Sequence, residues 1–208
     1  MLEGSLQYRL RLILIFSLLL FVSGCETAYY GTMEKLGYHK RDLTVNRVES
    51  ARDAQEDAKE EFESALEKFS SVLQFDGGDL EDKYDQLKAA YDRSSARAQT
   101  VRDRIDSVED VASDLFDEWE AELSEYSSDS LRRSSARKLK QTRRQYTRLI
   151  GAMKRAESKM DPVLTAFHDQ VLFLKHNLNA RAIAALQTEL ISVESEVNSL
   201  IKDMNASI

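Results

Sequence analysis

The stretch DRIDSVEDVASDLFDEWEAELSEYSSD, residues 103–129, is followed by SLRRSSARKLKQTRRQYTRLIGAMKRA, residues 130–156. The first half contains eleven acidic residues and one basic residue, whereas the second contains ten basic residues and no acidic one. Two helices joined near Ser128 would place these blocks side by side, where opposite charges attract. The pattern therefore predicts an antiparallel helical hairpin in which Glu122 lies near Arg133.

The basic block has two interpretations. Acidic residues at the end of one helix and basic residues at the start of the next oppose the helix dipole, at about 0.3–1 kcal/mol per charge. Because this arrangement is unfavourable, the charged blocks are expected to have a role that compensates for its cost. That role is either interhelix pairing that fixes the register or binding of an anionic ligand, such as a lipid or another polyanion. The candidate residues for both roles are Arg132, Arg133, Arg137, Lys138, Arg143 and Arg144.

Composition and the spacing of apolar residues predict an all-α fold. The chain of 208 residues contains one proline, seven glycines and 31% charged residues, as chains of long helices do. Apolar residues recur at alternating spacings of three and four, which is the seam of a coiled coil. We expect an elongated antiparallel coiled-coil or helical bundle of three long helices plus a shorter C-terminal helix, in a domain spanning residues 41–208. The expected helices cover about residues 41–75, 80–126, 131–174 and 183–204.

The seams predict the core residues and raise one question of continuity. The first seam contains Gln55 among phenylalanines and alanines, and the second continues from Ala112 to Leu115. The third begins at Leu131 and is weakened by Ser135. Pro162 lies in the third seam, which keeps its phase across the proline. A continuous helix is therefore favoured, and a new helix capped by Asp161 is the alternative. Turns are expected at Gly77-Gly78, Ser127-Ser128 and near Asn179.

Residues 1–24 are expected to be a lipoprotein signal peptide. Arg9 and Arg11 precede an apolar run at residues 12–22, which is shorter than the roughly 20 residues that cross a bilayer. Small residues directly before Cys25 resemble the bacterial lipoprotein signal, in which the thiol receives a diacylglycerol and becomes the mature N-terminus. The alternative is an inert Cys25 at the end of a retained membrane helix. The residues expected to be recognised by the signal machinery are Val22, Ser23 and Gly24.

The front of the chain also predicts location and partners. Cys25 is the expected lipidation site, carrying palmitate among its acyl chains, and residues 25–40 are expected to form the lipidated tether. Glu26 stands where aspartate is associated with inner-membrane retention, which favours the outer membrane. The chain is acidic, with a net charge of −7, so an exported protein of this kind is not expected to bind nucleic acid. An envelope protein is the expected partner, and narrow seams also allow a homo-oligomer.

No constellation of catalytic or metal-binding residues is apparent. His39, His168 and His176 do not form the i, i+4 pair with which a helix binds a metal ion. Gly77-Gly78 lacks the lysine of a phosphate-binding loop. We therefore expect no metal, no cofactor and no enzymatic activity.

Seven short motifs are distributed along the chain: residues 37–43 (GYHKRDL), 47–49 (RVE), 51–55 (ARDAQ), 75–80 (FDGGDL), 116–120 (FDEWE), 131–135 (LRRSS) and 172–180 (LFLKHNLNA). These motifs resemble an uncharacterised gamma-proteobacterial lipoprotein family, known as a domain of unknown function. The resemblance spans essentially the whole mature chain and implies no activity. Together with the seams, it predicts a lipid-anchored periplasmic coiled-coil protein with a structural or protein-interaction role in the envelope. The alternative is a protein that binds anionic lipid or another polyanion through its basic third helix.

Overall fold

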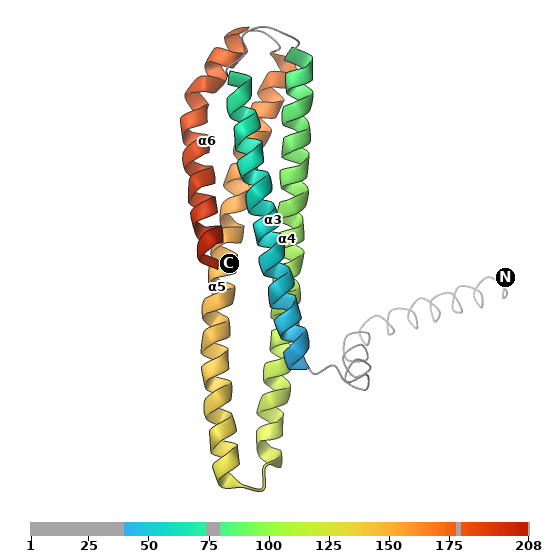
Figure 1. The fold of residues 1–208 in the computed structure, drawn as a ribbon, viewed down its shortest axis with the longest axis vertical. Helices are drawn as coiled ribbons and strands as arrows, with labels where there is room; N and C mark the ends of the chain where they lie inside the picture. Colours follow the sequence, from blue (N-terminus) through green and yellow to red (C-terminus); the bar gives the residue numbers. More distant parts are fainter. Residues whose placement is uncertain (1–39, 74–79, 178–179, 208) are drawn as a thin grey trace, which may run out of the picture. The chain divides into compact units, whose positions relative to one another are not determined.

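The computed structural model describes residues 40–73, 80–177 and 180–207, and nearly all of them are helical. The helical bundle lies in a compact unit that spans residues 44–208. Its helices pack antiparallel (Figure 1), which confirms the predicted bundle of three long helices plus a shorter fourth. The helices are α3 (Lys40–Leu73), α4 (Leu80–Glu122), α5 (Asp129–His176) and α6 (Ala180–Ser207), with a short 3₁₀ turn, η2 (Leu123–Glu125), after α4.

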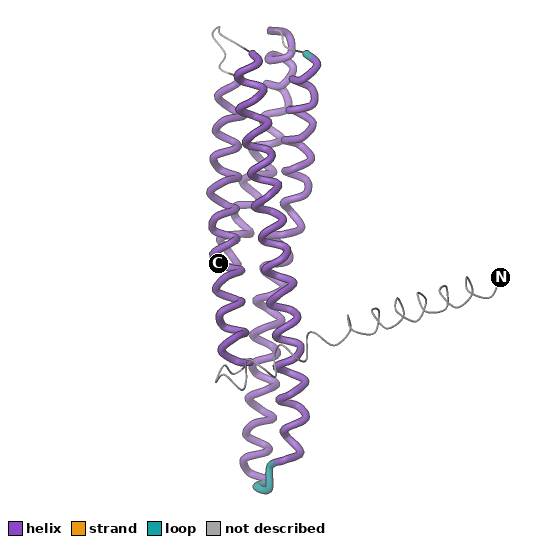
Figure 2. Tube along the Cα trace, turned by 90° about the vertical axis from the view of Figure 1, so that its right-hand side faces the viewer, coloured by secondary structure: helices purple, strands orange, loops and turns teal. Residues whose placement is uncertain are grey.

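The helices overlap along only part of their length. Pairing of Arg93 with Glu61 joins α4 to α3, and pairing of Lys159 with Asp203 joins α5 to α6. Both views show that α4 and α5 continue past the ends of α3 and α6 as a two-helix hairpin (Figures 1 and 2). The bundle therefore has a four-helix part and a hairpin part, and the hairpin contains the charged stretch.

The core of the four-helix part follows the predicted seams. The Phe69 and Phe167 rings stack at 4.4 Å between centroids, and Phe62 lies 6.4 Å from Phe167. Small residues beside these rings let the helices approach closely. The predicted seam residues that are buried in α3 and α4 are Ala51, Gln55, Ala58, Phe62, Ala65, Phe69, Val72, Leu87, Ser94, Ala98, Val101, Ile105, Val108 and Ala112.

Gln55 shows how a polar side chain is accommodated in this core. Its Nε2 donates to the carbonyl of Met153 at 3.5 Å, and its Oε1 accepts from Ser207 Oγ at 3.0 Å. A buried amide that lost these partners would cost free energy, because it would have given up its bonds to water. The glutamine therefore links α3 to α5 and to the last residue of α6.

Helix α5 is continuous through Pro162, so the alternative of a new helix at that point is wrong. Met160, Val163 and Phe167 on either side of the proline are all fully buried. Packing of one uninterrupted seam stabilises the helix, although proline removes one backbone donor from it.

The turn between α4 and α5 confirms the predicted break near Ser128. The Ser128 hydroxyl accepts a hydrogen bond from the Leu131 amide at 3.4 Å, and Ser128 has an extended backbone, as an N-cap requires. The expected turns at Gly77-Gly78 and near Asn179 lie outside the described residues.

Two details of the predicted seams are wrong. Leu131 is 59% exposed, so the buried seam of α5 does not begin there. In α4 the seam passes through Phe116, which is buried, in place of the expected Leu115. A step of four residues from Ala112 replaces the expected step of three, because the larger Phe116 ring fills the space against Tyr146.

Candidate functional site: the charged helical hairpin

Ion pairs join the acidic side of α4 to the basic side of α5. Arg143 pairs with Glu120 at 2.7 Å, and Lys154 pairs with Glu109 at 2.7 Å. The hydrogen bond from Lys154 to Glu109 raises the pKa of Lys154 above its usual range, so its ammonium is held in the charged form. Farther from the turn, the base of the pair is on α4 and the acid is on α5, because Arg102 pairs with Asp161.

The register of these pairs differs from the expected one. Glu120 meets Arg143, whereas the charge pattern predicts Glu122 close to Arg133. Side chains lean toward the N-terminus of their own helix, so those of α4 lean away from the turn and those of α5 lean toward it. An acid of α4 therefore meets a base of α5 whose Cα atom lies farther from the turn than the Cα atom of the acid.

Arg143 is held by several contacts at once. Its guanidinium lies 5.4 Å from the centre of the Phe116 ring and also donates to the Phe116 carbonyl at 3.3 Å. The Phe116 ring packs edge-on against Tyr146, and burial raises the pKa of the Tyr146 phenol. Leu139 completes this small apolar cluster. Arg143 thus stabilises the hairpin through its charge and through packing.

The polar seam residue Ser135 has a structural partner. Trp119 Nε1 donates to Ser135 Oγ at 2.8 Å, across the hairpin. Buried indole N–H groups usually require such an acceptor. The serine that weakens the predicted seam is therefore the acceptor that Trp119 needs.

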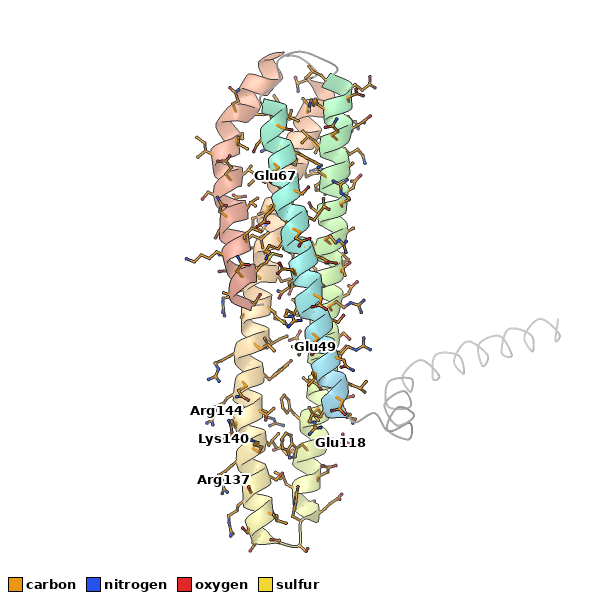
Figure 3. All side chains as sticks on the ribbon, viewed as in Figure 1. Glu49, Glu67, Glu118, Arg137, Lys140 and Arg144 are labelled. Atoms are coloured by element: carbon orange, nitrogen blue, oxygen red, sulfur yellow. The ribbon has the colours of Figure 1, made fainter. Side chains whose placement is uncertain are left out.

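The remaining predicted basic residues lie elsewhere on α5. Arg132 pairs with Asp129 in the first turn of the same helix at 2.6 Å. Within the described helices, no ion pair involves the exposed side chains of Arg133, Arg137, Lys138 or Arg144. Figure 3 shows Arg137, Lys140 and Arg144 along the outer edge of α5 in this view. Of the six candidates, Arg143 is the residue that pairs across the hairpin.

A groove of about 540 Å³ lies between α4 and α5 near the turn. Leu123 and Leu139 contribute apolar surface to it. Lys140, Arg144 and Arg148 line it with positive charge, and the paired Arg143 and Glu120 line it as well. An anionic group that carries an apolar portion matches both features of this groove.

The groove involves residues that the sequence-based candidates omit. Lys140 and Arg148 follow Arg133, Arg137 and Arg144 at helical spacing, so a projection of the helix would have identified them. Leu123 could not be identified in this way, because its place in the groove depends on how α4 ends.

A second groove, of about 850 Å³, lies between α5 and α6. It is lined by apolar residues such as Phe173 and Leu186 and by acids that include Glu189 and Glu196. Among its lining residues, Gln170 is only 6% exposed, and its Nε2 has no hydrogen-bond partner.

The histidines and other expected sites are distributed as follows. His168 lies 5.4 Å from the Tyr91 ring and 3.7 Å from Asp169, and it is half exposed. No group of three potential metal ligands occurs among the residues that the structure describes. None of the described helices has an apolar stretch long enough to cross a bilayer. His39, Cys25 and the predicted signal residues 22–24 lie outside the described part of the chain.

Comparison with known proteins gives a family and no closer relative. No curated protein and no solved structure matches the chain. A family described as "protein of unknown function (DUF2959)" matches residues 29–208, which include the whole bundle. The chain belongs to this family, the DUF2959 family.

Proposed function

We propose that this protein is a lipid-anchored, non-catalytic helical bundle with a structural or protein-interaction role in the bacterial envelope. The observation that carries the proposal is the continuous apolar core of the bundle, which runs from Ala51 to Met204 through all four helices. Within this core the polar side chain of Gln55 is bonded to both α5 and α6, which aligns these helices with α3. Such an arrangement provides a rigid rod on which exposed faces can bind a partner.

The location is inferred from the front of the chain. Residues 22–24 and Cys25 resemble a lipoprotein signal, so the mature protein would begin at an acylated Cys25 and be held at the periplasmic face of a membrane. Glu26 favours the outer membrane over the inner one. The resemblance to gamma-proteobacterial lipoproteins supports the same location.

A protein partner is supported by apolar side chains that the bundle leaves in solvent. Ile191 of α6 is 75% exposed, and Leu172 and Phe173 of α5 are also exposed. Exposed apolar residues are common singly, but several along two adjacent helices offer a surface for docking. We propose an envelope protein as the partner.

Crosslinking in cells tests the interaction role. A photo-reactive amino acid at Ile191 should give a discrete crosslinked species of higher mass, identifiable by mass spectrometry. The same amino acid at Arg104, an exposed and charged position of α4, serves as the matched control. Indistinguishable crosslink patterns at the two positions would contradict a partner at this face.

A further inference from the structure

A row of cations follows one face of α5. Spacings of four, three, four and four residues place them on the same side of the helix. The buried residues Ile150 and Met153 lie on the other side of the helix. We call this row the basic stripe; its residues, all exposed, are Arg133, Arg137, Lys140, Arg144 and Arg148.

The acids of α4 do not neutralise the basic stripe. The ion pairs that cross the hairpin use Arg143 and Lys154, whose positions around the helix differ from those of the stripe. α5 itself contains no acid between residues 130 and 156. Like charges at spacings of three and four repel one another, so the bundle accepts an electrostatic cost along this face.

The groove beside the basic stripe adds an apolar element. Leu139 and Leu123 line it, and Lys140, Arg144 and Arg148 of the stripe contribute its positive charge. Its volume of about 540 Å³ lies within the range of small-molecule sites. Cations next to an apolar lining are complementary to a lipid with an anionic headgroup.

We propose that the basic stripe and this groove bind the surface of an anionic phospholipid membrane. The phosphates would lie among Arg137, Lys140 and Arg144, and Arg guanidinium groups match phosphate geometry particularly well. Each Lys or Arg near an anionic lipid surface raises the affinity by about fivefold. Arg143 also lines the groove, where it is paired with Glu120 and packed on Phe116, so the unpaired cations of the stripe are the ones proposed to meet the phosphates.

The position of the stripe fits the proposed anchor, and this step rests on the proposed function. Asp57 of α3 pairs with Arg97 of α4. Because the two helices are antiparallel, Thr44, thirteen residues before Asp57, lies near the level of Asp110, thirteen residues after Arg97. Lys154 pairs with the neighbouring Glu109, and the stripe begins about 9 Å from Lys154 on the side of the turn. The chain thus enters the bundle next to the stripe. Fifteen peptide steps separate Cys25 from Lys40, the first residue of α3, and they reach at most about 54 Å, so an anchored bundle can bring the stripe to its own membrane.

Vesicle co-sedimentation tests the proposal on the unlipidated chain from Glu26 to Ile208, which contains the whole core of the bundle. The vesicles consist of phosphatidylcholine alone or mixed with phosphatidylglycerol. We expect binding to the anionic vesicles only, and weaker binding as salt is added, because salt screens exposed charges. Binding to neither kind of vesicle, or equal binding to both, would overturn the proposal.

Two triple variants with the same change in charge locate the binding. R137Q/K140Q/R144Q should reduce affinity for the anionic vesicles about a hundredfold, at about fivefold per cation. K88Q/R93Q/R97Q removes three exposed cations from the four-helix part and should reduce affinity far less. Circular dichroism must show the same helix content for both variants and the parent chain. An equal loss in the two variants would show dependence on net charge alone and would contradict a site on the stripe.

The chain used in the vesicle experiment carries no lipid anchor, so the result tests the stripe and does not test the proposed function. Failure to bind vesicles would remove the stripe as a lipid-binding surface and leave acylation of Cys25 unaffected.

Discussion

Glu157 of α5 lies where the hairpin meets the four-helix part of the bundle. Burial raises the pKa of its carboxyl group, and the nearby acids Asp106 and Glu109 raise it further. Arg102, at 4.0 Å, and Lys154 oppose this shift without cancelling it. The charged form of Glu157 is therefore less favourable in the folded protein than in the unfolded chain.

The shift gives a pH-dependent prediction for Glu157→Gln. Because the folded pKa lies above the unfolded one, Glu157 lowers stability as pH rises through the interval between these two values. The variant should melt at a higher temperature than the parent near neutral pH. The difference should shrink as pH falls below that interval, where Glu157 is protonated in both states. Thermal melts across this pH range would contradict the assignment if the variant were less stable near neutral pH.

Gln170 makes a second prediction at this scale. Its buried Nε2 has no partner, and such a donor costs about 1–3 kcal/mol. Gln170→Leu has a similar volume and no polar atom, so it should raise the free energy of unfolding by about 1 kcal/mol in urea titration. Gln55→Leu is the control, because both polar atoms of Gln55 are bonded and their loss should not stabilise the protein. A decrease in stability for Gln170→Leu would show that its amide has a partner after all.

Single residues also show what the sequence can predict. The seam placed Gln55 inside the bundle, because its position repeats that of Phe62 and Phe69. The partners of Gln55 could not be predicted, since Met153 and Ser207 belong to helices whose relative height is set by packing of the whole bundle. The sequence predicts that Ser135 weakens the seam, whereas in the structure its hydroxyl oxygen accepts a hydrogen bond from Trp119.

At the scale of the helices, the hairpin depends on a few pairs. Arg143 and Glu120 are partly exposed, and an exposed pair contributes about 0.2–1 kcal/mol. Their pairing is reinforced by Phe116, which contacts Arg143 through both its ring and its carbonyl group.

A double-mutant cycle tests this register of the hairpin. Arg143→Glu and Glu120→Arg should each lower stability, and the double variant should recover part of the loss, with a coupling energy of about 0.5–1 kcal/mol. Glu122 with Arg133, the pair expected from the charge pattern alone, is the matched control and should show coupling near zero. Stronger coupling between Glu122 and Arg133 than between Glu120 and Arg143 would contradict the register in the structure.

The helix boundaries and seams were predictable from the sequence. The pairing of α4 with α5 was predictable too, but the division of the cations between the hairpin interface and solvent was not. Opposite blocks of charge predicted that α4 and α5 form a hairpin, and the structure confirms a hairpin there. A count of charges cannot tell which cations face the acids and which face solvent. That division depends on rotation of α5 about its axis, which the buried side chains of Leu139 and Ile150 set.

At the scale of the whole molecule, the apolar periodicity was sufficient to predict an antiparallel four-helix arrangement. The limited overlap of the helices was partly predictable, because the last helix is the shortest. The two grooves were not predictable, since each depends on where one helix stops beside another. The family adds no activity to this description, so the proposed function rests on the sequence that precedes the bundle and on the exposed faces.

The central claim is that the bundle is held to a membrane by a lipid on Cys25, and acyl labelling tests it most directly. The full chain and its Cys25→Ser variant would be expressed in a Gram-negative host with labelled palmitate. We predict that the parent protein is labelled, remains with the membranes and begins at an acylated Cys25 by mass spectrometry, whereas the variant is unlabelled. A parent protein without label, or one that retains residues 1–24, would contradict the account.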